Sequence, residues 1–347
     1  MTVRHDEPLA PLTTLGLGGP ARHLVEATSD DEVVDAVARA DIDGEPLLLL
    51  GGGSNVVLPD EGFPGTVVLL RTRGVTVDGA TVTAAAGEEW DPLVTHCVAA
   101  GLAGIECLAG IPGRVGATPV QNVGAYGQDV AQTITAVTAY DRQTRRRGTL
   151  DATACGFSYR SSVFKRQPGR WVVLGVSFAL TASSLSAPVR YAELARALGV
   201  ETGARVPLAA VGPVVVALRR RKGMVVAGDD PDSASVGSFF TNPVLSTAEY
   251  DALAARADAA GLGEPPHWPE ADRVKVSAAW LVQAAGFTPG HGGGAVRVSG
   301  KHALALTHRG GGTSAELLAL AREVRDGVLS RFGVQIVPEP VLVGASF

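Results

Sequence analysis

The chain has 347 residues, 46% of them hydrophobic and 19% charged, and its formal net charge is −5. This length predicts two or three domains with sizeable cores. The acidic balance, with no basic run longer than 219–222, argues against nucleic-acid binding. Cys97, Cys107 and Cys155 show no C-x-x-C spacing, so neither a disulfide framework nor a structural zinc site is expected. With no signal pattern and no long apolar run, we expect a soluble cytoplasmic protein without a membrane segment.

The first 70 residues predict a small β-α-β-β unit. Residues 1–13 are interpreted as a polar lead-in, and the glycines at 16–19 as turn glycines, because no helix pattern follows them. Ser29 and Glu32 form a capping box for a helix that ends near Ala40. The predicted strands are 21–27, 46–50 and 66–70.

The next segment predicts a hairpin and a second helix. Asp78-Gly-Ala80 is flanked by strand patterns at 75–77 and 81–86, which favours a tight turn between paired strands. Asp91 is predicted to cap a helix that Pro92 opens and Gly101 stops.

The rest of the chain alternates predicted helices and strands. Pro213 is predicted to begin a helix over 214–222, and the polar, acidic stretch 228–235 predicts a domain boundary near 220. Capping residues Ser246, Ser277 and Thr313 predict three later helices. The remaining predicted elements are a helix over 191–198 and strands over 133–140, 171–180, 295–298, 303–307, 334–337 and 341–343.

A glycine-punctuated loop at 109–127 is the most informative stretch. Its nineteen residues include five glycines, two prolines and one formal charge, Arg114, so it is neither a helix nor a plain surface linker. Such a loop suits backbone that lies directly against a ligand, because glycine lets main-chain N–H groups approach an anion.

A second loop of this kind follows the apolar run 47–50. Three glycines and two capping residues, Ser54 and Asn55, complete it. Alone, it is either a tight turn between strands or a nest for phosphate oxygens. Two such loops together favour a large pyrophosphate-bearing ligand.

Three further segments carry candidate chemistry. Arg160 lies between Phe157 and Phe164, and a partly buried guanidinium needs an anion, either an internal carboxylate or a substrate. Ser238 stands between a glycine and two aromatics, as a capping serine or as a hydroxyl in a confined site; no G-x-S-x-G elbow surrounds it. Glu339 lies between two prolines, either exposed at a turn or buried with a purpose.

The motifs L-L-G-G-G-S-N and I-P-G-R-V-G-A-T-P-V-Q-N-V-G-A-Y-G resemble those of the MurB family, the UDP-N-acetylenolpyruvoylglucosamine reductases. The resemblance covers nearly the whole chain. It implies an α+β protein with an FAD-binding fold of the vanillyl-alcohol-oxidase/PCMH type and a C-terminal α+β substrate domain. The implied domains are 1–70 and 71–220, the two FAD-binding subdomains, and 221–347, the substrate-binding domain.

The resemblance also implies the cofactors and the residues that hold them. The enzyme would use non-covalent FAD with NADPH as reductant. The implied FAD-binding residues are Gly51, Gly52, Gly53, Ser54, Asn55, Gly113, Gly116, Ala117, Gln121, Asn122, Gly124, Ala125, Tyr126 and Gly127.

Arg160, Ser238 and Glu339 match the family's catalytic positions. By that match, Arg160 and Glu339 polarise the enolpyruvyl carboxylate of UDP-N-acetylglucosamine enolpyruvate, and Ser238 donates a proton to the substrate. The implied substrate contacts are Tyr159, Tyr191, Lys222, Asn242, Lys275 and His302, and Tyr191 suggests the longer of two types. The chain departs from the family pattern at Thr241, His308 and Pro340.

Two rival functions remain open at this point. One is an FAD-dependent oxidase of an alcohol or sugar, and the other is a non-catalytic nucleotide-sugar binding protein. No H-x-x-x-H or H-E-x-x-H spacing occurs, so a catalytic metal is not expected. We expect a monomer.

Overall fold

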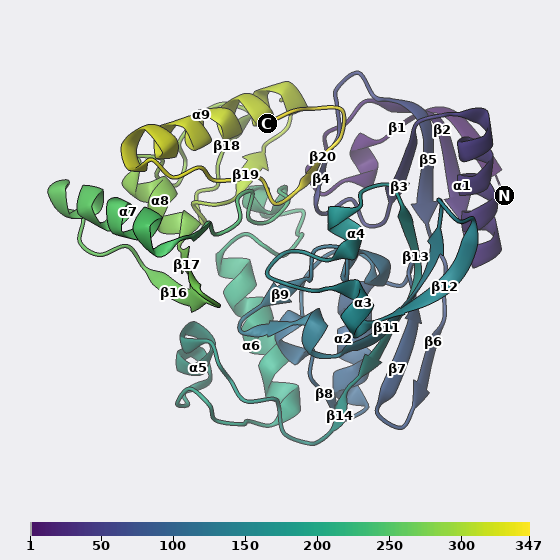
Figure 1. The fold of residues 1–347 in the computed structure, drawn as a ribbon, viewed down its shortest axis with the longest axis horizontal. Coiled ribbons are helices and arrows are strands. Elements are labelled where there is room, and N and C mark those ends of the chain that lie inside the picture. Colours follow the sequence, from purple (N-terminus) through teal and green to yellow (C-terminus); the bar gives the residue numbers. More distant parts are fainter. Residues whose placement is uncertain (1) are drawn as a thin grey trace. The chain divides into compact units, whose positions relative to one another are not determined.

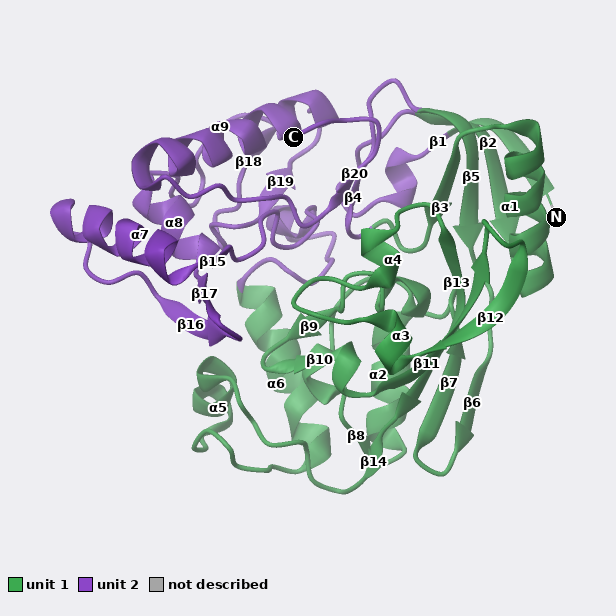
Figure 2. Ribbon diagram, viewed as in Figure 1, with its two compact units in different colours: residues 1–7, 20–53, 63–221 green, residues 8–19, 54–62, 222–347 purple. Residues whose placement is uncertain are grey.

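The computed structural model describes residues 2–347, and the chain divides into two compact units (Figure 2). Unit 1 contains residues 1–7, 20–53 and 63–221, and unit 2 contains residues 8–19, 54–62 and 222–347. The chain therefore enters and leaves each unit more than once. The short stretches 8–19 and 54–62 belong to unit 2, although they fall early in the sequence.

Unit 1 is built on two main sheets (Figure 1). Its strands are β1 (Thr2–Pro8), β2 (Pro20–Ala27), β3 (Leu47–Leu50), β5 (Phe63–Leu70), β6 (Val75–Asp78), β7 (Thr81–Ala85), β8 (Leu102–Ala103), β9 (Gly124–Ala125), β10 (Gln128–Asp129), β11 (Ile134–Asp141), β12 (Arg146–Asp151), β13 (Trp171–Ala179) and β14 (Thr181–Ala182). The four-stranded sheet has the order β1-β2-β5-β3, and β5 runs parallel to both β2 and β3. The antiparallel five-stranded sheet has the order β12-β11-β13-β7-β6.

The helices of unit 1 follow the sequence signals in part. They are α1 (Asp30–Asp43), α2 (Trp90–Ala99), α3 (Ala152–Cys155), α4 (Val163–Arg166), α5 (Ala192–Leu198) and α6 (Leu208–Arg221). Ser29 caps α1 as predicted, because its hydroxyl accepts the N–H of Glu32. The Glu32 carboxylate does not complete a capping box, since it accepts from the N–H and hydroxyl of Thr28 instead.

Three further predictions for unit 1 were wrong. The expected lead-in forms the edge strand β1, whose exposed polar residues gave no burial signal (Met1 lies outside the described residues). Asp91 does not cap α2, which begins one residue earlier; its carboxylate accepts the N–H of Gly110. Pro213 lies inside α6, because the buried face of this helix continues on both sides of the proline and its burial outweighs the lost hydrogen bond.

Unit 2 contains three helices of seven residues or more, among short strands. Its elements are β4 (Val56–Val57), β15 (Val244–Leu245), α7 (Thr247–Ala259), β16 (His267–Glu270), β17 (Arg273–Val276), α8 (Ala278–Ala284), β18 (Val296–Val298), β19 (Leu306–His308), α9 (Ser314–Phe332) and β20 (Val341–Leu342). The predicted caps Ser246, Ser277 and Thr313 are confirmed, and the first and last of them form full capping boxes.

Two strand predictions in unit 2 need correction. Residues 334–337 form no strand, because the prolines at 338 and 340 lack the N–H groups that a ladder requires; a single bridge joins Phe240 and Pro338. The strand expected at 303–307 is limited to β19. The mixture of helices with largely antiparallel sheets confirms the predicted α+β class.

Candidate active site

The two glycine loops of unit 1 lie against each other. A Cβ added to Gly52 would stand 2.7 Å from the Cα of Gly113, and one added to Gly51 would stand 3.4 Å from the Arg114 side chain. Such an approach of backbone to backbone leaves no room for a side chain. We call these facing loops, residues 51–53 and 113–127, the cradle.

The cradle contains an unusual concentration of left-handed backbone. Gly53, Gly113 and Gly127 have positive φ values, as glycines often do. Asn122 and Tyr126 also have positive φ, at 48° and 50°. Residues other than glycine adopt a positive φ at a cost in free energy, and residues with this strained backbone are often found at functional sites. The cradle conformation is therefore held by the surrounding structure, and not by local preference.

Arg160 is fixed to the cradle. Its Nη1 donates to the Asn122 carbonyl at 3.2 Å, and its Nη2 donates to the Gly124 carbonyl at 2.8 Å. Its own φ is 50°, and its guanidinium lies 5.6 Å from the centre of the Tyr159 ring. Main-chain carbonyls thus orient the donor fork of the Arg160 side chain.

Two tyrosines predicted for different ligands meet in unit 1. The rings of Tyr126 and Tyr191 are 5.5 Å apart and nearly perpendicular, a favourable edge-to-face arrangement. Tyr191 remains 43% exposed, whereas burial raises the pKa of Tyr126 to about 12. The raised pKa keeps the Tyr126 phenol neutral at physiological pH.

In unit 2, the segments that carry Ser238 and Glu339 lie beside each other. The Glu339 N–H donates to the Phe239 carbonyl at 2.8 Å, so Glu339 lies beside the residue that follows Ser238. Asn55 joins the same cluster, because its Nδ2 lies 3.5 Å from the Glu339 carbonyl and its own carbonyl accepts the N–H of Val341. Segments from three parts of the sequence thus meet at Glu339.

The remaining predicted substrate residues have structural contacts in unit 2. The Asn242 carboxamide oxygen accepts the N–H of Ala278 at the start of α8, and Lys275 forms an ion pair with Glu270 at 2.6 Å. His302 accepts the N–H of Leu304 through its Nδ1 atom. Lys222 directly follows α6 and is half-buried.

Arg219 is only 9% exposed, and no role was predicted for it. Its Nε donates to the Gly110 carbonyl at 3.1 Å, next to the cradle, and burial lowers its pKa. The charge run 219–222 concealed this residue, because a run of basic residues at a helix end usually faces solvent. Its position four residues after the buried Val215, on the same face of α6, was the available signal.

His308 also has a contact that the sequence did not suggest. Its Nδ1–H donates to the Leu15 carbonyl at 2.9 Å, and its Nε2 accepts the N–H of Gly312 at 3.1 Å. The ring therefore joins the early stretch 8–19 to the loop before α9 within unit 2.

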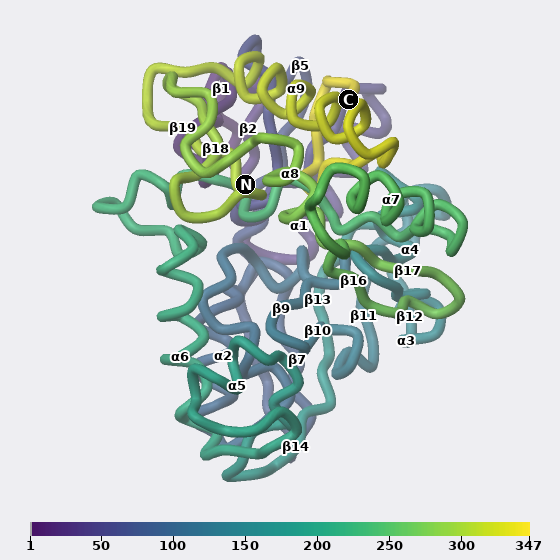
Figure 3. Tube along the Cα trace, turned by 90° about the vertical axis from the view of Figure 1, so that its left-hand side faces the viewer, coloured from purple at the N-terminus to yellow at the C-terminus, as the bar shows by residue number. Residues whose placement is uncertain are grey.

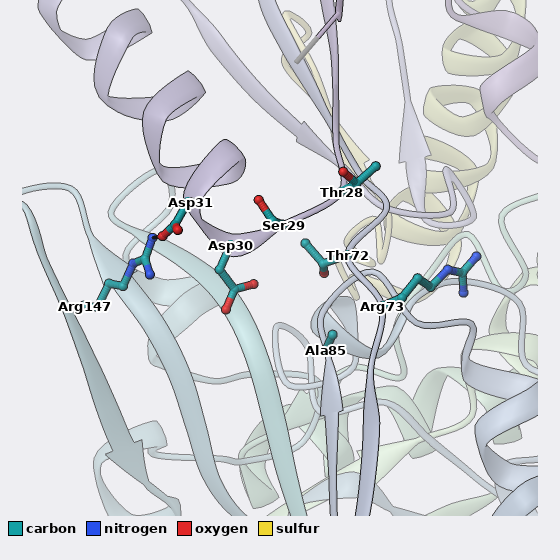
Figure 4. A pocket seen from close by; sticks show the side chains of 8 residues that line it. All are labelled: Thr28, Ser29, Asp30, Asp31, Thr72, Arg73, Ala85 and Arg147. Carbon is teal, nitrogen blue, oxygen red and sulfur yellow. Dashed lines mark hydrogen bonds and ion pairs between the residues drawn. The ribbon is translucent and has the colours of Figure 1, made fainter.

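A separate surface pocket lies at the start of α1 (Figure 4). Its polar walls include Asp30, Arg73 and Arg147. None of its lining residues belongs to the predicted site. Among residues 2–347, no group of three or more His, Cys, Asp or Glu side chains is arranged to hold a metal ion.

Comparison with known proteins decides the family. A model of the FAD binding domain matches residues 21–148, and a model of the UDP-N-acetylenolpyruvoylglucosamine reductase C-terminal domain matches residues 230–343. The reductases of that name from Streptomyces coelicolor and Salinispora arenicola are each 58% identical to this chain, over 99% and 97% of it and 90% and 95% of their own lengths. The chain belongs to the UDP-N-acetylenolpyruvoylglucosamine reductase family.

The fold agrees with this membership. The crystal structure of the reductase from Thermus caldophilus has a TM-score of 0.66 and 23% sequence identity, and the match covers 98% of both chains. The resemblance drawn from the glycine loops and the predicted FAD-binding fold are therefore confirmed.

Proposed function

We propose that this protein is an NADPH-dependent flavoenzyme that reduces the enolpyruvyl group of UDP-N-acetylglucosamine enolpyruvate to give UDP-N-acetylmuramate, a peptidoglycan precursor. Two relatives that carry the reductase name are 58% identical to it over nearly the whole chain. The backbone hydrogen bond from the Glu339 N–H to the Phe239 carbonyl carries the proposal, because Glu339 then lies beside the residue that follows Ser238.

The cradle fits the diphosphate of FAD. It offers main-chain N–H groups without side chains, and the Gly52–Gly113 approach would be lost if a Cβ were present. FAD supplies hydride chemistry that no side chain can provide. The residues proposed to hold it are Gly51, Gly52, Gly53, Ser54, Asn55, Gly113, Gly116, Ala117, Gln121, Asn122, Gly124, Ala125, Tyr126 and Gly127.

Three side chains are proposed to act on the substrate. Reduction of the enolpyruvyl double bond builds negative charge on the conjugated carboxylate, and the Arg160 guanidinium stabilises that charge. Glu339 assists in its protonated form, because an ionised carboxylate would repel the developing charge. Ser238 then donates a proton to the basic carbon, a step for which a neutral hydroxyl is adequate.

Six further residues are proposed to bind the substrate. Tyr191 covers it from beside Tyr126, and Lys222 meets the diphosphate. The full set is Tyr159, Tyr191, Lys222, Asn242, Lys275 and His302.

We further propose that the enzyme is a cytoplasmic monomer. All three cysteines are free and buried, which suits a reducing compartment. Among residues 2–347, no helix has the length and apolar character needed to cross a bilayer.

Product analysis tests the activity. Purified protein with FAD, NADPH and the enolpyruvyl nucleotide is expected to yield a product two hydrogen atoms heavier, with one NADPH consumed for each product. Oxygen uptake with alcohols or sugars and no reduced nucleotide would instead indicate an oxidase. Tight nucleotide-sugar binding without any product would indicate a binding protein.

A further inference from the structure

Glu106 is a carboxylate with no exposed surface, in a 3₁₀ turn at Glu106–Leu108. Its Oε2 accepts the N–H of Gly104 at 2.6 Å, and its Oε1 accepts the N–H of Ala187 at 2.6 Å. Gly104 is near in sequence, but Ala187 is 81 residues away. The side chain therefore joins the core of unit 1 to a distant segment by a short, charge-assisted hydrogen bond.

That distant segment is an arm, residues 184–207, which contains α5. Backbone hydrogen bonds close its base: Ser186 N–H donates to the Val206 carbonyl and Val189 N–H donates to the Ala204 carbonyl. Its helix lies beside α6 (Figures 1 and 3). Tyr191 follows Ala187 by four residues and immediately precedes α5. The hydrogen bond at Ala187 therefore limits where the Tyr191 backbone can lie.

The same 3₁₀ turn also holds the loop that carries Tyr126. The N–H of Cys107 donates to the Gln128 carboxamide oxygen at 2.8 Å, and Gln128 is 7% exposed. Gln128 pairs with Ala125 across the β9–β10 hairpin, whose turn contains Tyr126. The adjacent residues Glu106 and Cys107 thus hold the arm and the β9–β10 hairpin, respectively. These two segments carry the tyrosine rings that lie 5.5 Å apart.

We propose that Glu106 is a positioning residue that holds Tyr191 opposite Tyr126 for substrate binding. The inference rests on the proposed function, in which Tyr191 covers the substrate. With Glu106 in place, the arm is ordered before the substrate arrives. Without the Glu106 carboxylate, the arm occupies several positions, and substrate binds only when Tyr191 lies opposite Tyr126. The apparent affinity for substrate is then the intrinsic affinity multiplied by the fraction of molecules in that position.

Glu106→Gln tests this in the FAD-loaded enzyme. The amide can still accept one N–H, but its NH₂ group faces the other backbone donor. We expect the apparent Kd of the enolpyruvyl nucleotide to weaken about tenfold, the loss typical of a charge-assisted hydrogen bond, while kcat changes less than twofold. Amide hydrogen exchange over 187–200 in substrate-free protein should become faster.

Glu32→Gln is the matched control. Glu32 also accepts a backbone N–H in unit 1, from Thr28 at 2.7 Å, but it lies at the start of α1. The same loss of charge there should leave the substrate Kd and the exchange of the arm unchanged.

The Tyr191→Ala background separates positioning from general destabilisation. If Glu106 acts through Tyr191, adding Glu106→Gln to Tyr191→Ala should cause no further loss of affinity. A second tenfold loss in that background, or unchanged exchange of the arm in Glu106→Gln, would overturn the proposal. Should Glu106→Gln fail to fold, Glu106→Asp keeps the charge while shortening the reach, and the same readouts apply. If the wild type binds no enolpyruvyl nucleotide, the proposed function fails, and the exchange data still decide whether Glu106 holds the arm.

Discussion

The cradle of unit 1 and the Ser238–Glu339 cluster of unit 2 are built in different ways. The cradle consists of main chain: glycines that exclude a Cβ, residues with left-handed φ, and carbonyls that hold Arg160. The unit 2 cluster consists of short segments that backbone hydrogen bonds join near Glu339, and its proposed chemistry depends on side chains. The first region should therefore be sensitive to added atoms, and the second to removed functional groups.

The largest effect is expected from removing the hydroxyl of Ser238. Ser238→Ala should lower kcat by about 10²–10⁴-fold, the usual contribution of a positioned proton donor, while FAD reduction by NADPH stays at the wild-type rate. Steady-state and anaerobic stopped-flow rates measure the two steps. Ser330→Ala, at an exposed position of α9, is the control. Wild-type turnover in Ser238→Ala would remove the proton donor from our scheme.

Adding one methyl group to the cradle should have the next largest effect. Gly52→Ala places a Cβ 2.7 Å from the Gly113 backbone, so the loops must separate, and we expect about 1–3 kcal/mol of destabilisation and loss of retained FAD. In the same unit, Gly148→Ala meets no heavy atom within 4 Å and should keep its FAD. Flavin absorbance after dialysis and thermal unfolding report the outcome. Equal FAD retention in both variants would show that the close approach is not required.

A smaller effect is expected outside both regions, at the Arg170–Asp141 pair of unit 1. The hydrogen bond from Arg170 lowers the pKa of Asp141 to about 2. Because this pKa is below its unfolded value of about 4, the pair stabilises the fold above about pH 4 and this stabilisation is lost as the pH falls toward 2. Asp141→Asn should therefore show a flatter loss of stability between pH 5 and pH 2, approximate limits set by these pKa values. Urea unfolding midpoints across this range measure it, and parallel pH curves for the two proteins would contradict the assignment.

The smallest effect is expected from treating the native protein with an alkylating reagent, because its three cysteines are buried. Burial raises the pKa of Cys97 and Cys155 to about 11 and that of Cys107 to about 12. Native protein at pH 8, an approximate value well below these pKa values, should therefore resist alkylation, and all three thiols should react after unfolding. Mass spectrometry of treated protein gives the count, and rapid modification of the native state would show that a thiol is accessible.

The sequence predicted helices best where a local chemical signal marks their ends. Ser29, Ser246 and Thr313 each cap a helix as expected, because a side-chain oxygen satisfies nearby N–H groups. The predictions failed where contacts between residues far apart in the sequence determine the local structure. Edge strand β1 has an exposed polar pattern, and Pro213 is carried inside α6 by the burial of residues on both sides of it.

The residues of the candidate site could likewise be predicted only where a local sequence pattern marks them. Glycine spacing in the two loops predicted a backbone cradle, because glycine lets main-chain N–H groups approach a ligand closely. Arg219 and Glu106 escaped notice, since their roles depend on carbonyl and N–H groups far along the chain. No local pattern marks a buried carboxylate whose partner is 81 residues away.

The most direct test of the central claim is the visible absorption spectrum of the purified protein, followed anaerobically as NADPH and then substrate are added. We predict flavin bands that bleach with NADPH and return with UDP-N-acetylglucosamine enolpyruvate. A colourless protein that binds no added FAD would contradict the cradle, and a coloured protein that NADPH cannot bleach would contradict the reductase.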